Sequence, residues 1–253
     1  MSARGLLIVN ADDWGGNRSG TDAIERCFAD GAISSSTAMV HMADARRAAE
    51  IALEGERPIG LHLNLTQPFD APDVPAAVRA RQRDLCRHFS RLASRRWIPS
   101  PSARVRALIA DAIRDQLERF AELYESEPTH IDSHHHVHVC PDVFLSAALE
   151  RGVRVRQTIS PLPAARRGPA TIARRAKHRS LARRFTTTTH FWAARELSPA
   201  DGAIPIATAV ALARTQPVEI MVHPSFAGEL RVLRSELWLQ ALAGAALGPY
   251  SAL

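Results

Sequence analysis

Histidines are concentrated in one short segment of this 253-residue chain. Five of its eleven histidines fall within nine residues, and they are His130, His134, His135, His136 and His138. Imidazole is a common metal ligand, and Asp132 stands among the five as a carboxylate that can fix the tautomer of a neighbouring ring. If the chain stays extended, every second residue from Asp132 to His138 lies on one face. The cluster therefore indicates a metal site.

Two adjacent acids, Asp12 and Asp13, follow the apolar run Leu6–Ala11. Neighbouring carboxylates repel each other, so a cation usually compensates their charge. Either acid could instead cap the helix expected to follow. Beside so many histidines the pair favours metal binding, in which one acid binds the ion and the other takes a proton from a bound water.

Two further histidines, His62 and His223, each stand between an apolar run and a polar turn. A mixed set of carboxylate and imidazole ligands suits Zn²⁺, Mn²⁺ or a related ion, whereas a carboxylate-rich set suits Mg²⁺ better. An open coordination position would make such an ion hydrolytic rather than structural. We therefore expect a hydrolytic centre.

The segments that must position these residues alternate between strand and helix patterns. Short apolar or β-branched runs predict strands at Leu6–Ala11, Ser34–Val40, Pro58–Leu65, Thr129–Ser133, Gly152–Arg156 and Val218–Val222. Helical spacing or helix-start signals predict helices at Ser19–Ala29, Ala43–Leu53, Ser102–Tyr124, Pro141–Leu149, Ile206–Ala213 and Leu230–Ala243. Four of the strands end in the acids and histidines above, and the carboxyl ends of parallel strands commonly build the site.

This alternation predicts an α/β fold with a mainly parallel sheet. We expect a single-domain (β/α) barrel over residues 1–253, TIM-like and irregular or incompletely closed, although an open doubly wound sheet also fits the pattern. Two proline-rich or arginine-rich segments, at about 67–101 and 158–185, are expected to be irregular insertions.

The composition is that of a globular enzyme, at 46% hydrophobic and 23% charged residues. No run of about 18 apolar residues predicts a membrane span. The N-terminus turns acidic after a short apolar run, which argues against a signal peptide. We expect a cytoplasmic protein.

The excess of positive charge lies in one part of the chain. Between Arg151 and Arg195 there are eleven arginines and Lys177 but no Asp or Glu, so the rest of the chain is negative although the net charge is +6. The segment could bind an anion, but a solvated insertion explains it more simply, because few aromatic residues accompany the arginines.

Four motifs, in this order and spacing, resemble the YdjC-like carbohydrate deacetylases, a group that includes chitooligosaccharide deacetylases. They are LLIVNADDWG, GLHLNLT, THIDSHHHVHVCPDVF and MVHPSF, and the resemblance covers roughly residues 5–157 and 216–242. It implies a β/α-barrel hydrolase that removes the acetyl group from an N-acetylated amino sugar with one divalent metal ion, Mg²⁺ or Zn²⁺.

The resemblance also implies roles for individual residues. Asp13, His62 and His134 would bind the metal. Asp12 would act as general base on the metal-bound water, and His223 would protonate the departing amine. The candidate substrate-binding residues are Trp14, His136 and Arg156. Trp14 stands where the family pattern leads us to expect phenylalanine, and it could stack on a sugar face or fill the same pocket.

Residues 158–200 match nothing in the family pattern. A basic lid there would suit a sugar that carries phosphate or is linked to a lipid, and a homodimer is compatible with the chain. The main alternative is another barrel metallohydrolase such as a phosphoesterase, which would usually hold two or three ions. A nucleic-acid-binding protein would use the basic stretch but leaves the histidine cluster unexplained.

Overall fold

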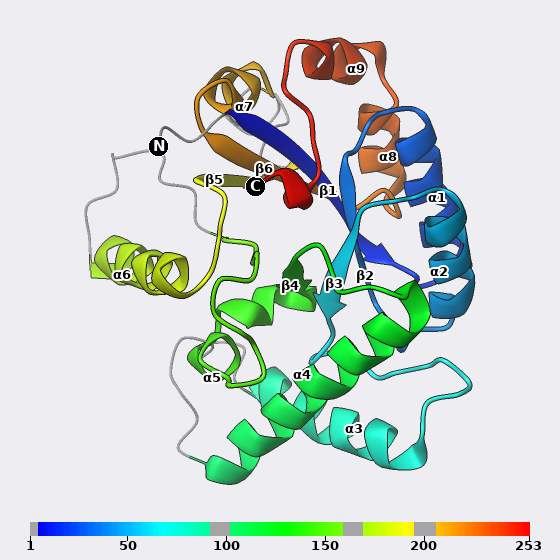
Figure 1. Cartoon of the computed structure of the whole chain (residues 1–253), viewed down its shortest axis with the longest axis vertical. Helices are drawn as coiled ribbons and strands as arrows, with labels where there is room; N and C mark the ends of the chain where they lie inside the picture. The colour runs from blue at the N-terminus through cyan, green and yellow to red at the C-terminus, as the bar shows by residue number, and fades with distance from the viewer. Residues whose placement is uncertain (1–4, 92–101, 159–168, 195–205) are drawn as a thin grey trace. The chain divides into compact units, whose positions relative to one another are not determined.

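The computed structural model describes residues 5–91, 102–158, 169–194 and 206–253 (Figure 1). Its strands are β1 (Leu6–Trp14), β2 (Ser35–Ala38), β3 (Ile59–Leu63), β4 (Ile131–Ser133), β5 (His190–Ala193) and β6 (Pro217–Val222). They form one sheet in the order β4-β3-β2-β1-β6-β5. The pairs β1–β6, β3–β4 and β5–β6 are parallel. In the described residues the strand order has two ends, which confirms the predicted α/β fold with an incompletely closed sheet.

The larger helices are α1 (Arg18–Ala29), α2 (Ala45–Glu54), α3 (Ala76–Arg91), α4 (Ala103–Tyr124), α6 (Pro169–Arg184), α7 (Ile206–Ala213), α8 (Ala227–Leu233) and α9 (Glu236–Ala243). Shorter turns of helix are α5 (Pro141–Phe144), η1 (His134–Val139) and η4 (Tyr250–Ala252). The longest, α4, begins where the Ser102 side chain accepts a hydrogen bond from the backbone of Val105 and ends at Glu125 in a left-handed conformation. No helix among the described residues is long and apolar enough to cross a membrane.

Contacts along the chain separate two compact units. Unit 1 comprises Met1–Asp12, Asp22–Ser36 and Arg154–Leu253, and unit 2 comprises Asp13–Thr21 and Thr37–Val153. In unit 1 the strands β1, β6 and β5 pair with one another, and in unit 2 β3 pairs with β4 while α3 packs along α4. The single domain over residues 1–253 stays a prediction.

Both segments expected to be irregular contain a long helix. Residues 76–91 form α3 and residues 169–184 form α6, so the expected insertions are helical in these parts. Within Ala76–Arg91 there is neither proline nor glycine, and Ala, Arg, Gln and Leu are strong helix formers. The flanking prolines suggested a loop, but they lie outside the helix. Residues 67–75 form turns and irregular backbone, and residues 92–101 and 159–168 lie outside the described residues.

Three other expected elements differ from the structure. The helix expected at Pro141–Leu149 ends at Phe144. The strand expected at Gly152–Arg156 is reduced to a bridge between Arg154 and Thr186, and β5, which was not expected, lies at the edge of the sheet. The helix expected at Leu230–Ala243 is divided, because the Ser235 side chain caps a new helix by accepting from Trp238 N.

The histidine cluster does not continue as a strand. β4 ends at Ser133, and residues 134–139 form a short 3₁₀ segment in which His135 and His136 have left-handed backbones, with φ 56° and 55°. The expected common face of every second residue from Asp132 to His138 is therefore wrong. The Ser133 hydroxyl stabilises the turn, because it accepts a hydrogen bond from His138 N at 2.7 Å.

Candidate active site

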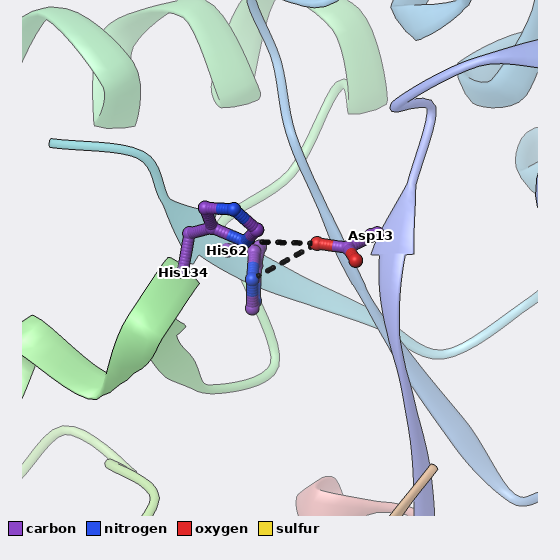
Figure 2. A group of neighbouring side chains, drawn as sticks. All are labelled: Asp13, His62 and His134. Atoms are coloured by element: carbon purple, nitrogen blue, oxygen red, sulfur yellow. Dashed lines mark ion pairs between the residues drawn. The ribbon is translucent and has the colours of Figure 1, made fainter. Parts of the chain in front are cut away.

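Three side chains of unit 2, Asp13, His62 and His134, converge on one point (Figure 2). One ligand atom from each lies within 4.8 Å of the other two. Asp13 Oδ1 is 3.3 Å from His62 Nε2 and 3.3 Å from His134 Nδ1. The structure thus brings together the three residues predicted to share a metal ion, and their role as ligands stays a prediction.

Each of the three residues owes its place to a strand. Asp13 lies near the end of β1 with a left-handed backbone, φ 71°, a conformation that costs a residue other than glycine about 1–3 kcal/mol. His62 lies in β3, in register with Asp132 of the neighbouring β4. His134 is the first residue after β4, where the chain turns out of the sheet. All three side chains therefore lie at or near the end of a strand, as expected from the sequence.

Asp132 and Thr37 fix the orientation of the His62 ring. His62 Nδ1 lies 2.7 Å from Asp132 Oδ1, and the Thr37 hydroxyl donates to Asp132 Oδ2 at 3.1 Å. An ionised carboxylate only accepts hydrogen bonds, so Nδ1 carries the proton and donates it to Asp132. The other ring nitrogen, Nε2, is the one that faces Asp13, with Oδ1 at 3.3 Å. This carboxylate–histidine arrangement is typical of metal-binding histidines.

The electrostatics of Asp13 fit a cation. Burial would raise the pKa of Asp13, but the imidazoles of His134 and His62 outweigh burial and hold the pKa well below its usual range. Asp13 Oδ1 is itself buried and accepts no regular hydrogen bond from any described residue. The Asp13 carboxylate oxygen and the two imidazole nitrogens 3.3 Å from it form a ligand set that suits a divalent metal ion.

The neighbouring acid, Asp12, has a separate set of partners in unit 1. It is 2% exposed, and the two terminal nitrogens of Arg156 donate to its two oxygens at 2.7 Å each. The Asn10 side chain donates to the same carboxylate at 3.0 Å. Successive side chains of a strand point in opposite directions, which explains why two adjacent acids differ so much in their surroundings. These contacts hold Asp12 ionised and in one orientation.

His223 follows β6 directly and lies near Asp12 within unit 1. Its Nε2 is 3.9 Å from Asp12 Oδ2, and its side chain is 24% exposed. The backbone N–H of His223 donates to Glu229 Oε2 at 2.6 Å, so the first turn of α8 fixes the turn that carries the ring. A half-exposed imidazole beside a buried carboxylate can deliver a proton to a group arriving from solvent.

Two of the three predicted substrate-binding residues have no accessible side chain. Trp14 is 0% exposed, and its indole N–H donates to Ala48 O at 3.2 Å. In this structure Trp14 fills a pocket, which is one of the two alternatives that the sequence left open, and its contact with substrate stays a prediction. Arg156 is also 0% exposed, and its guanidinium is engaged by Asp12 and Glu219. Its role in substrate binding stays a prediction.

His136 is the remaining candidate. Its half-buried ring lies edge-on to His138, with centroids 6.1 Å apart. Nothing in its described surroundings tests a contact with substrate, and the role stays a prediction.

Three polar residues around the site were missed from the sequence. Thr37 bonds to Asp132, Glu229 bonds to the backbone of His223, and Glu219 accepts from Arg156 Nε at 2.6 Å. Thr37 and Glu219 have no local signature, because their partners lie 95 and 63 residues away in the chain, whereas Glu229 is only six residues from His223. For Glu219 the only sequence signal was its place inside the apolar run VEIMV, which indicates a buried side chain.

Known proteins are similar to this chain in sequence. A family model described as YdjC-like protein matches residues 6–243. A chitooligosaccharide deacetylase of Enterobacter sp. (strain 638) is 36% identical over 157 residues, which cover 60% of this chain and 58% of the relative. That of Proteus mirabilis (strain HI4320) is 34% identical over 140 residues, 55% of this chain and 52% of the relative. The chain thus spans little more than half the length of these relatives.

A solved structure is similar in fold. A protein of Enterococcus faecalis V583, described as a candidate cellobiose-phosphate cleavage protein, has a TM-score of 0.69, with 19% sequence identity and 99% of both chains covered. At this identity the likeness concerns the fold alone.

Proposed function

This chain belongs to the YdjC-like family, and from that premise we propose that it is a metal-dependent hydrolase that removes the acetyl group from an N-acetylated amino sugar. The observation that carries the proposal is the convergence of Asp13, His62 and His134 within 4.8 Å. The names of the curated relatives support the same reaction, because both are chitooligosaccharide deacetylases.

Asp13, His62 and His134 would hold one divalent ion. Two imidazoles and one carboxylate are a ligand set that suits Zn²⁺ better than Mg²⁺, which prefers oxygen ligands. A bound ion would act as a Lewis acid toward the acetyl carbonyl and the attacking water. Asp132 would support the site by keeping the His62 proton on Nδ1.

Asp12 would be the general base. Its carboxylate takes a proton from water as the water oxygen bonds to the carbonyl carbon. Arg156 keeps Asp12 ionised before the reaction and limits its rotation, because it binds both carboxylate oxygens.

His223 would be the general acid. The amide C–N bond breaks with its electron pair going to nitrogen, and the protonated imidazole supplies the proton that the departing amine needs. The products are acetate and the free amino sugar. The partial exposure of His223 allows the ring to exchange protons with solvent between cycles.

The substrate is an N-acetylated sugar or oligosaccharide, and its finer features are part of the proposal. Arg179 and Arg183 are exposed on α6, whose sixteen residues include no acid, so an anionic or lipid-linked sugar would find positive charge there. The arginine pairs at 166–167 and 174–175 have side chains outside the described residues. A homodimer and a cytoplasmic location complete the proposal and are tested by sedimentation and cell fractionation.

The test combines metal analysis with product detection. Purified protein is analysed for bound metals, and acetate release is then measured on neutral, phosphorylated and lipid-linked N-acetyl sugars with Zn²⁺ or Mg²⁺ added. One ion per chain and acetate release from at least one sugar are expected. Two or three ions per chain, with phosphate released in place of acetate, would replace the proposal with the phosphoesterase alternative.

A further inference from the structure

We propose that Glu219 and Tyr250 are positioning residues that orient Arg156 toward the general base Asp12. The inference rests on the proposed function, because Asp12 is the base only in that reaction. Glu219 is a buried carboxylate in β6, and Tyr250 lies in η4, near the C-terminal end of the described residues.

The four residues form a continuous chain of hydrogen bonds inside unit 1. The Tyr250 hydroxyl donates to Glu219 Oε2 in a short contact, and Arg156 Nε donates to Glu219 Oε1 at 2.6 Å. The two terminal nitrogens of Arg156 then reach Asp12 at 2.7 Å each. Each side chain is therefore linked to the next through different atoms.

Burial of these charged groups carries a desolvation cost, so stability alone does not account for the arrangement. Glu219, Arg156 and Tyr250 are each 0% exposed, and Asp12 is 2% exposed. Glu219 lies in register with Ile8 of β1 on one side and Phe191 of β5 on the other, positions where an apolar side chain would complete the core. A buried ion pair is often no more stabilising than apolar residues of similar volume. A role in orientation explains why charges are present there.

The geometry of the guanidinium explains how the orientation is passed on. Arginine presents its donors in a planar fork, so fixing one edge fixes the direction of the others. Glu219 binds the Nε edge, which aims both terminal nitrogens at Asp12. Tyr250 occupies the second oxygen of Glu219 and thereby limits rotation of that carboxylate. Two carboxylates share one guanidinium, and the tyrosine proton partly balances the remaining negative charge.

The test compares Tyr250→Phe and Glu219→Gln with a matched control. The control, Trp238→Phe, removes another buried hydrogen-bond donor of unit 1. The indole N–H of Trp238 donates to Ala32 O at 3.0 Å, and this bond is not part of the hydrogen-bond series that leads from Tyr250 to Asp12. For each variant, kcat, KM, bound metal and Tm are measured. We expect kcat to fall about tenfold or more in Tyr250→Phe and Glu219→Gln, with KM and metal content close to wild type. The control should lower Tm without changing kcat.

Tyr250→Phe removes one hydroxyl and so remains informative if Glu219→Gln fails to fold. An unchanged kcat in Tyr250→Phe, or equal losses of kcat in Tyr250→Phe and Trp238→Phe, would overturn the proposal. If the wild-type protein releases no acetate from any sugar, the proposed function fails, but a crystal structure of Tyr250→Phe still decides the positioning role. Arg156 and Asp12 found in unchanged orientations would then overturn it, and a rotated Arg156 would support it.

Discussion

Arg156 binds both carboxylate oxygens of Asp12 through its two terminal nitrogens, at 2.7 Å each, in a site closed to solvent. A bidentate pair of this kind fixes the plane of the carboxylate as well as its charge. The arginine predicted to bind substrate therefore contacts Asp12, the acid next to the proposed metal ligand Asp13.

Replacing Arg156 with lysine should distinguish a role in orienting Asp12 from a role in binding substrate. Lysine keeps the positive charge but has no planar fork, so Asp12 would lose its fixed orientation. We expect kcat to fall about 10- to 100-fold while KM changes less than about threefold. A steady-state comparison on the best substrate checks this. A large rise in KM at constant kcat would restore Arg156 as a substrate-binding residue.

Asp12→Asn should keep its metal and lose turnover. The amide is nearly isosteric but cannot take a proton from water, and loss of general base catalysis typically lowers kcat by about 10²–10⁴. Metal content by mass spectrometry and acetate release are measured on the same preparation. Asp111→Asn, at an exposed position of α4, serves as the control and should be fully active. Activity retained in Asp12→Asn would remove this residue from the mechanism.

Substitutions of the proposed metal ligands should behave differently from Asp12→Asn. His62→Ala and His134→Ala each remove one proposed ligand, so metal occupancy itself should fall. Asp132→Asn leaves the ligands in place but loosens the His62 ring, and we expect about 10- to 100-fold weaker binding of Zn²⁺ in a competition titration.

His88→Ala is the matched control for these substitutions, because it removes an imidazole of α3 that is not one of the proposed metal ligands. It should bind Zn²⁺ like wild type. Wild-type affinity in both His62→Ala and His134→Ala would refute the ligand assignment.

The convergence of Asp13, His62 and His134 could be predicted because each stands at or near a strand end, and parallel strands bring their ends to one edge. The turn that carries His134 could not, since His135 and His136 adopt left-handed backbones that only the packed structure enforces. The same limit applies to Glu219, whose partner Arg156 lies 63 residues away in the chain.

Element types were predicted best where the periodic pattern was long or the apolar run pronounced, as in Ser102–Tyr124 and Ile206–Ala213. The helix α3 was missed because prolines on both sides suggested a loop, although its own residues favour a helix. Short β5 was missed because four residues, HFWA, carry too little alternation to be distinguished from a loop.

Phe226 is an exposed aromatic residue beside His223, the proposed general acid, whereas the aromatic side chain of Trp14 is buried. It is 61% exposed, and its ring centroid lies 5.6 Å from that of His223. Aromatic faces commonly line ligand sites, so Phe226→Ala should raise KM about fivefold, which corresponds to ~1 kcal/mol, with little change in kcat. Leu237→Ala, at an 80% exposed residue of α9, is the control. Equal KM values in both variants would exclude stacking by Phe226.

A pH-dependent contribution to stability should come from Asp115 on α4. Its carboxylate lies 2.7 Å from His41 Nε2 and 3.1 Å from the guanidinium of Arg81. Burial would raise the pKa of Asp115, but His41 and Arg81 outweigh burial and hold the pKa below its usual value of 3.8. The group is therefore more acidic in the folded than in the unfolded chain, and its stabilisation is present above about pH 4 and lost as the pH falls further.

Asp115→Asn should accordingly lower Tm most near neutral pH and progressively less below the ordinary pKa of 3.8. The loss at pH 7 is expected to be ~1 kcal/mol, about 2–4 °C for a chain of this length. Thermal unfolding is followed by circular dichroism between pH 3 and pH 7, with Asp111→Asn as the control, since Asp111 pairs with Arg114 at the exposed surface of the same helix. A Tm difference that stays constant across this range would contradict the assignment of the effect to the ionised carboxylate.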